Sequence, residues 1–141
     1  MIYLLDTNVV SEAMKPAPNR DVMAWIDLIP AEQLWICTIV VAEVLSGLDL
    51  MPAGKRQSLL REKAEAMFSA IFKDRIFPFD LTAAQAVGPI LRERKKIGRP
   101  MDSMDALIAA TAAAHSATIA TRNVRDFASC GVPVVDPWST A

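Results

Sequence analysis

Short apolar runs alternate along this chain with longer segments in which apolar residues recur every three or four positions. The runs are too short for helices and rich in strand-forming residues, which predicts strands at 2–5, 34–37, 76–80, 118–121 and 132–135. The longer segments predict helices at 9–14, 19–29, 39–50, 55–72, 81–97 and 100–114. Alternating strands and helices favour an α/β fold with a mainly parallel sheet flanked by helices. We expect one domain over residues 1–141.

Acidic residues recur where the predicted strands end or the following helices begin. Asp6 follows the first strand directly, Asp126 comes just after the fourth, Asp105 opens a helix, and Glu43 lies in an apolar helix. Because open α/β sheets bind ligands at the carboxyl ends of their strands, these four acids are expected to converge. The simpler alternative is that Asp6 only caps a helix.

Four converging carboxylates repel one another unless a cation lies between them. Oxygen ligands suit Mg²⁺, or Mn²⁺, rather than zinc. Such a site can activate water and cleave a phosphodiester bond. Polar neighbours are candidates for orienting the carboxylates: Thr7, Asn8, Thr121 and Asn123. Glu43 lies among apolar residues, so we expect a positive group to compensate it.

Cations gather at the end of the helix predicted at 81–97. Five cations fall within eight positions and are expected to form a patch that contacts phosphate groups: Arg92, Arg94, Lys95, Lys96 and Arg99. Within this patch we expect a track for the RNA backbone made of Arg92, Lys95, Lys96 and Arg99. The alternative is that these cations only complement the helix dipole. The net charge of −1 argues against attraction of nucleic acid over the whole surface.

The overall composition, 52% hydrophobic and 22% charged, is typical of a globular protein. The N-terminus lacks the basic region of a signal peptide, no run is long enough to span a membrane, and no zinc-ligand spacing surrounds Cys37 or Cys130. We therefore expect a cytoplasmic protein with free thiols. The single histidine, His115, is expected to be an ordinary residue at a helix end.

Four motifs occur in an order that resembles PIN-domain toxins of the VapC class, close to their FitB-like branch. They are LDTNVVSE at 5–12, VAEV at 41–44, DALIAA at 105–110 and TRNVRDF at 121–127. The resemblance spans nearly the whole chain. It implies a five-stranded PIN-like fold and a Mg²⁺-dependent endoribonuclease, the toxin of a type II toxin–antitoxin pair.

By the same resemblance, Asp6 and Asp105 are metal ligands, and Glu43 and Asp126 complete the acidic set. Asp102 lies three residues before Asp105 and is either an additional acid of the site or a helix cap. The implied partners are an RNA substrate and a cognate antitoxin whose tail occupies the active-site groove. A homodimer that forms a heterotetramer or larger assembly with the antitoxin is implied, with DNA contacted only through the antitoxin.

Two other functions fit the same fold. A catalytically silent binding module would retain the partner surface but would have little use for four crowded acids. An aspartyl-phosphate phosphoryl-transfer enzyme would use Asp6 as its nucleophile. For the antitoxin, Trp25, Met51 and Phe68 are candidate groove residues, and the alternative is that all three belong to the core.

Overall fold

A computed structural model describes residues 1–139, and five strands form one parallel sheet in it. The strands are β1 (Tyr3–Leu5), β2 (Leu34–Cys37), β3 (Ile76–Phe77), β4 (Thr118–Ala120) and β5 (Val134–Val135). Their order is β3-β2-β1-β4-β5, and every neighbouring pair is parallel. The predicted α/β fold and its edge strand at β3 are therefore confirmed.

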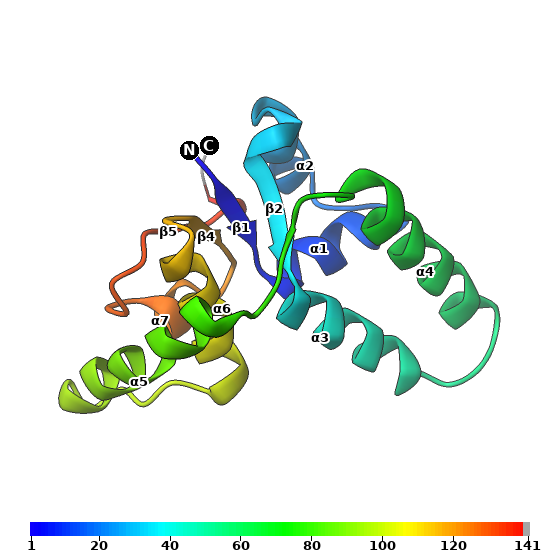
Figure 1. The fold of residues 1–141 in the computed structure, drawn as a ribbon. Coiled ribbons are helices and arrows are strands. Elements are labelled where there is room, and N and C mark those ends of the chain that lie inside the picture. Colours follow the sequence, from blue (N-terminus) through cyan, green and yellow to red (C-terminus); the bar gives the residue numbers. More distant parts are fainter. Residues whose placement is uncertain (140–141) are drawn as a thin grey trace.

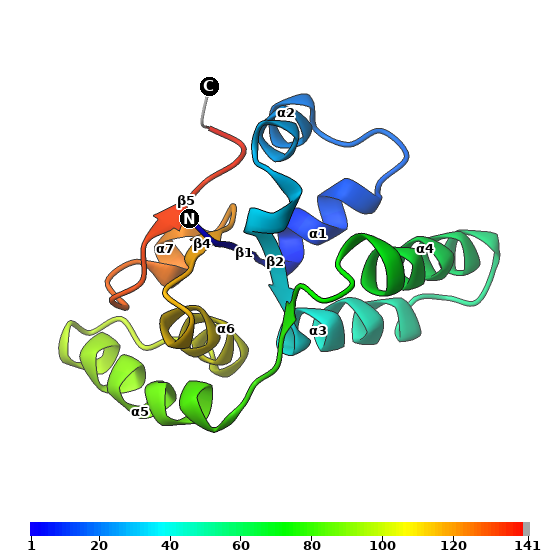
Figure 2. The ribbon, with the colours of Figure 1, turned by 45° about the horizontal axis from the view of Figure 1, so that its top comes forward.

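Seven α-helices flank this sheet. They are α1 (Thr7–Met14), α2 (Arg20–Leu28), α3 (Thr38–Asp49), α4 (Lys55–Ala66), α5 (Leu81–Lys96), α6 (Ser103–Ala114) and α7 (Val124–Phe127). A 3₁₀ turn at Ala31–Gln33 precedes β2, and a π-helical turn at Met67–Ile71 follows α4. Helices α1 to α4 lie on one side of the sheet and α5 to α7 on the other (Figures 1 and 2).

The chain changes direction in the sheet at β1. It runs from β1 through β2 to β3 on one side, then returns to place β4 and β5 on the other side of β1. The carboxyl ends of β1 and β4 therefore border the crevice where open parallel sheets bind ligands. The residues that follow these two strands are the ones expected to carry the chemistry.

The core is built from both faces of the central strands. Leu4, Ile36 and Ile119 have no exposed surface, as expected for parallel strands that helices cover on both sides. Helix α6 turns small buried residues inward, among them Ala109 and Ala110. Small side chains let α6 pack closely against its neighbours.

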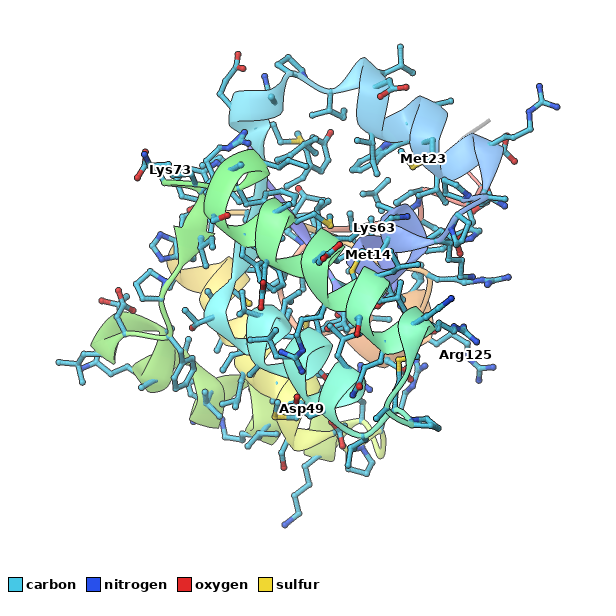
Figure 3. The ribbon with its side chains drawn as sticks, turned by 90° about the vertical axis from the view of Figure 1, so that its right-hand side faces the viewer. Met14, Met23, Asp49, Lys63, Lys73 and Arg125 are labelled. Atoms are coloured by element: carbon cyan, nitrogen blue, oxygen red, sulfur yellow. The ribbon has the colours of Figure 1, made fainter. Side chains whose placement is uncertain are left out.

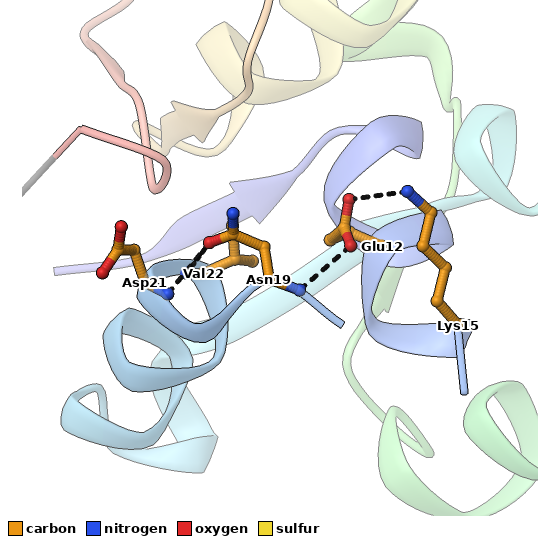
Figure 4. A network of polar contacts seen from close by, with 5 residues as sticks. All are labelled: Glu12, Lys15, Asn19, Asp21 and Val22. Atoms are coloured by element: carbon orange, nitrogen blue, oxygen red, sulfur yellow. Dashed lines mark hydrogen bonds and ion pairs between the residues drawn. The ribbon is translucent and has the colours of Figure 1, made fainter. Parts of the chain in front are cut away.

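The short helix α1 is tied to α2 by the buried carboxylate of Glu12 (Figure 4). Its two oxygens accept hydrogen bonds from Lys15 Nζ at 3.0 Å and from the Asn19 backbone N–H at 3.1 Å. The hydrogen bond from Lys15 is the main reason that the pKa of Glu12 is lowered. The Asn19 side chain then caps α2 by accepting from the backbone N–H groups of Asp21 and Val22.

Several predicted boundaries were wrong for local reasons. Helix α1 begins at Thr7 instead of 9, because Asp6 caps it. Helix α3 begins at Thr38 instead of 39, and the Thr38 hydroxyl accepts from the Phe79 N–H. The helix predicted at 55–72 is an α-helix only to Ala66, and its last part is the π-helical turn at Met67–Ile71. The apolar side expected there is incomplete, because Leu59 is 60% exposed.

Cys37 and Cys130 are buried free thiols, as predicted. No helix within residues 1–139 is long and apolar enough to cross a membrane.

Candidate active site

Asp6 lies at the carboxyl end of β1 with only 5% of its surface exposed. Its backbone N–H donates to the Ala120 carbonyl at 2.9 Å, which joins it to the end of β4. Oδ1 accepts from the Thr7 N–H at 2.8 Å, and Oδ2 accepts from the Thr121 hydroxyl at 2.7 Å. Asp6 is therefore a helix cap and also faces the crevice. Burial raises its pKa, the hydrogen bonds from Thr121 and Thr7 oppose that rise, and the charges of nearby acids add to it.

Asn8 joins the turn after β1 to the segment after β4. Its Nδ2 donates to Thr121 Oγ1 at 3.2 Å and, at 3.4 Å, to Asp6 Oδ2. Its Oδ1 accepts from the Arg122 N–H at 3.3 Å. Thr121 and Asn8 thus lie where side chains that orient Asp6 were expected. Asn123 takes part only through its backbone N–H, which donates to Thr121 Oγ1 at 3.0 Å.

Glu43 enters the crevice from the second turn of α3 and is half-buried. No Lys, Arg or His among residues 1–139 lies within 4 Å of its carboxylate, so none of these side chains is the positive group that was expected to compensate it. The Thr7 hydroxyl instead donates to Glu43 Oε1 at 2.6 Å. Thr7 therefore orients Glu43 through its side chain and binds Asp6 through its backbone.

Asp105 comes from the first turn of α6 and is half-buried. Its pKa is raised to about 6, first by burial and then by the charges of Asp6, Asp102, Asp126 and Glu43. Four acids from separate segments therefore act on one carboxyl group. Asp126 is exposed on α7, and Asp102 caps α6 by accepting from the Met104 N–H at 3.1 Å.

The donor set suits a hard cation better than zinc. It consists of carboxylate, hydroxyl and amide groups, and burial raises the pKa of the neighbouring Cys37 thiol to about 11, which keeps it protonated. Within residues 1–139, no three acidic, histidine or cysteine side chains are arranged to ligate one ion directly. Mg²⁺ normally keeps several waters and binds only one or two carboxylates directly, so the acids fit an ion held partly through water.

The expected cationic track lies on the end of α5 and in the loop that leads to α6. Arg92 and Lys96 both lie near Glu93, at 3.6 and 3.4 Å, and are exposed with Lys95. The Arg99 guanidinium donates to the Arg125 carbonyl at 3.4 Å. These residues remain accessible to a ligand, and the loop that they border leads to the helix of Asp105.

Arg94 was expected in the same phosphate-contacting patch, and this was wrong, because its side chain is buried. It is 4% exposed, and its guanidinium donates to the backbone carbonyls of Arg99, Arg125 and Ala128. It thereby holds the loop before α6 against the segment that contains α7. Its spacing of four residues from buried Ile90 was the available signal, since it places Arg94 on the buried face of α5.

A groove of about 840 Å³ runs from the candidate site between α1, α3 and α4. Thr7 and Glu43 lie at its acidic end, and Met51, Leu59 and Leu60 line its apolar part. Lys15, Arg56 and Lys63 also border it. Lys63 reaches across from α4 and donates to the Met14 carbonyl at 3.1 Å (Figure 3).

Of the three candidate groove residues, only Met51 lines this groove. The prediction that Trp25 is a groove residue was wrong, and the alternative that it belongs to the core holds. Trp25 is 8% exposed and packs edge-on against Tyr3, with ring centroids 5.1 Å apart. Phe68 is half-buried and packs against the core. A second cavity, of about 570 Å³, lies beneath α2 and the π-helical turn.

This chain is similar to known proteins along nearly its whole length. A family model described as PIN domain matches residues 3–131. Three curated relatives are similar over nearly the whole of both chains. "Plasmid stability protein StbB" of Pseudomonas syringae pv. tomato is 42% identical over 97% of this chain and 99% of its own. "VapC ribonuclease Y4jK" of Sinorhizobium fredii is 39% identical over 99% and 100%. "Toxin FitB" of Neisseria gonorrhoeae is 40% identical over 97% and 99%.

Solved structures show the same similarity. The structure of FitAB bound to an IR36 DNA fragment matches with a TM-score of 0.91 and 38% identity, over 99% of this chain and 98% of that chain. The structure of VapBC2 from Rickettsia felis, bound to a DNA fragment from the VapBC2 promoter, matches with a TM-score of 0.79 and 26% identity. The match covers 96% of this chain and 98% of that chain.

Proposed function

This chain belongs to the PIN-domain family, and from that membership we propose that it is a metal-dependent endoribonuclease, the toxin of a type II toxin–antitoxin pair. The observation that carries the proposal is the electrostatic coupling of Asp105 to Asp6, Glu43 and Asp126 at the switch point of the sheet. Crowded acids repel one another and destabilise a protein, so they are retained where a function requires them. Their presence argues against a silent binding module.

In this proposal Asp6, Glu43, Asp105 and Asp126 hold Mg²⁺, or Mn²⁺, directly or through water. A bound divalent ion supplies Lewis acidity and lowers the pKa of an attacking water. The chain's own groups keep the carboxylates in position, since Thr121 and Asn8 restrain Asp6 while Thr7 restrains Glu43. Both oxygens of Asp6 already accept hydrogen bonds, which suits a fixed ligand better than a free aspartyl nucleophile.

The RNA substrate reaches the acids past the cationic end of α5. Arg92, Lys95, Lys96 and Arg99 offset the repulsion between the acidic site and the phosphate backbone. This arrangement accounts for a nearly neutral chain that binds a polyanion, because the opposite charges occupy separate local surfaces.

The second partner in this proposal is a co-expressed antitoxin that binds along the groove between α1, α3 and α4. An apolar segment of the partner fits beside Met51 and Leu60, and a cationic tail fits against Glu43. The toxin acts in the cytoplasm as a homodimer, and promoter DNA is contacted through the antitoxin, in keeping with the DNA-bound relatives. Co-purification with the product of a small adjacent gene tests this part.

The direct test incubates the purified protein with total RNA in Mg²⁺ and in EDTA, then maps the fragment ends. We expect discrete internal cleavage sites in Mg²⁺ and intact RNA in EDTA. Equal cleavage in both conditions, or no cleavage of any RNA in Mg²⁺ or Mn²⁺, would overturn the proposal.

A further inference from the structure

The backbone around Arg122 is fixed directly to the candidate site. The preceding residue, Thr121, donates its hydroxyl hydrogen to Asp6 Oδ2, and the Arg122 N–H donates to Asn8 Oδ1. The following N–H, of Asn123, donates back to Thr121 Oγ1. The backbone of Arg122 therefore lies at the rim of the acidic crevice, and hydrogen bonds fix the residues before and after it.

The side chain of Arg122 is held over an aromatic ring. Its guanidinium carbon lies 5.2 Å from the centroid of the Trp138 ring. Trp138 is itself positioned by a turn in which its N–H donates to Asp136 Oδ1 at 2.9 Å, beside the fully buried Pro137. A cation–π contact of this kind favours one orientation of the arginine.

This contact leaves the guanidinium N–H groups available to a ligand. Within residues 1–139 no carboxylate lies within 4 Å of Arg122, and its side chain donates no hydrogen bond. Its charge also contributes to lowering the pKa of Glu12 on α1. Two other cations have partners of their own, since Lys15 pairs with Glu12 and Arg94 donates to backbone carbonyls.

A pre-oriented guanidinium with available N–H donors matches the geometry of a phosphate group, which it binds through two parallel hydrogen bonds. The geometry points to Arg122, supported by Trp138, as a binding residue for an RNA phosphate next to the bond that is cut. This inference rests on the proposed function. It adds a binding residue on the β4 side of the crevice, separate from the cationic end of α5, so the strand would be held on both sides of the acids.

The test measures binding of a single-stranded RNA oligonucleotide in Mg²⁺, with Asp6→Asn as the background that prevents cleavage. Arg122→Gln removes the charge and keeps the length of the side chain. We expect binding about tenfold weaker, and a slope of log K against log salt that is shallower by about 0.7, the value for one phosphate on a single strand. Arg122→Lys keeps the slope, because the charge remains. Trp138→Leu keeps the slope and weakens binding less than Arg122→Gln.

A purely structural role for Arg122 gives a different pattern. In that case Arg122→Gln and Trp138→Leu lower the melting temperature alike and leave the salt slope unchanged, and that result overturns the inference. If the wild-type protein cleaves RNA, but Arg122→Gln leaves the slope of log K against log salt unchanged, only this inference fails. If wild type neither cleaves nor binds any RNA, the proposed function fails and takes the inference with it.

Discussion

The Thr7 hydroxyl donates a hydrogen bond to Glu43 Oε1 at 2.6 Å, which joins the first residue of α1 to the second turn of α3. These residues are 36 positions apart in the sequence. The bond gives a donor to a half-buried glutamate that no cationic side chain within residues 1–139 contacts. It also directs Glu43 into the crevice, so the candidate site depends on a hydroxyl that is itself no metal ligand.

The first prediction concerns this hydroxyl. Thr7→Val keeps the shape of the side chain and the backbone N–H that binds Asp6, but removes the donor to Glu43. We expect RNA cleavage to fall about 10- to 100-fold, the usual cost of removing a partner that orients a metal ligand. Thr7→Ser retains the hydroxyl and should stay within a few fold of wild type. Equal losses in both variants would show that the methyl group, and not the hydrogen bond, matters.

The second prediction concerns the pH dependence of stability. The folded protein holds the proton of Asp105 up to about pH 6, whereas its ordinary pKa is 3.8. Between these values the folded state binds more protons than the unfolded state, so the free energy of unfolding falls as the pH rises. The raised pKa of Asp6 acts in the same direction.

Asp105→Asn should remove part of this decrease in the free energy of unfolding with rising pH. Urea unfolding in EDTA at pH 4 and pH 7 should show a smaller difference for the variant than for wild type, and at pH 7 the variant should be at least as stable. Asp74→Asn is a matched control on an exposed turn with φ of 66°, which asparagine tolerates. If Asp105→Asn melts well below wild type at pH 7, Asp105 acts chiefly as a structural residue of α6.

The third prediction separates buried Arg94 from its exposed neighbours. Arg94→Met leaves carbonyls of the loop before α6 and of residues 125–128 without their charged donor. We expect the free energy of unfolding to fall by about 2 to 4 kcal/mol, since a hydrogen bond to a charged group contributes about 1.5 to 3 kcal/mol. Arg92→Met, on the exposed side of α5, should change stability by no more than about 0.5 kcal/mol. Similar effects of the two changes in thermal melts would contradict this assignment.

The fourth prediction concerns the cationic end of α5. Replacing Arg92, Lys95, Lys96 and Arg99 with Ala should weaken RNA binding and flatten its dependence on salt by about 0.7 for each phosphate that the variant no longer binds. Lys73→Ala, at an exposed cation just before β3, should leave the slope unchanged. An unchanged slope in the quadruple variant would mean that these residues only complement the helix dipole.

Local patterns in the sequence were enough to predict the elements and their parallel arrangement. The runs at 2–5 and 34–37 are short, apolar and rich in β-formers, and each is followed by a helix signal, so β1 and β2 fall where expected. Boundaries failed where one side chain decided them, as with the Asp6 cap that starts α1 two residues early.

The sequence predicted the acids of the candidate site but not the partners that hold them. The position of Asp6 directly after β1 predicted that it lies at the crevice, because strand ends share one edge of a parallel sheet. Asp105 lies in the first turn of α6, and its assignment as a metal ligand came from the family resemblance and stays a prediction. The partners of these acids depend on interactions between distant segments. Thr7 with Glu43, Asn8 with Thr121, and Arg122 with Trp138 could not be paired from spacing alone.

The most direct test of the account compares Asp105→Asn with Asp102→Asn in single-turnover RNA cleavage in Mg²⁺. The two changes remove the same charge three residues apart, and asparagine can still cap α6 at position 102. We predict that Asp105→Asn lowers the cleavage rate by about 10²-fold or more, since a misplaced metal and water cost at least that much. Asp102→Asn should stay within a few fold of wild type. Near wild-type cleavage by Asp105→Asn, or an equal loss in both variants, would contradict the claim that Asp105 belongs to the metal site.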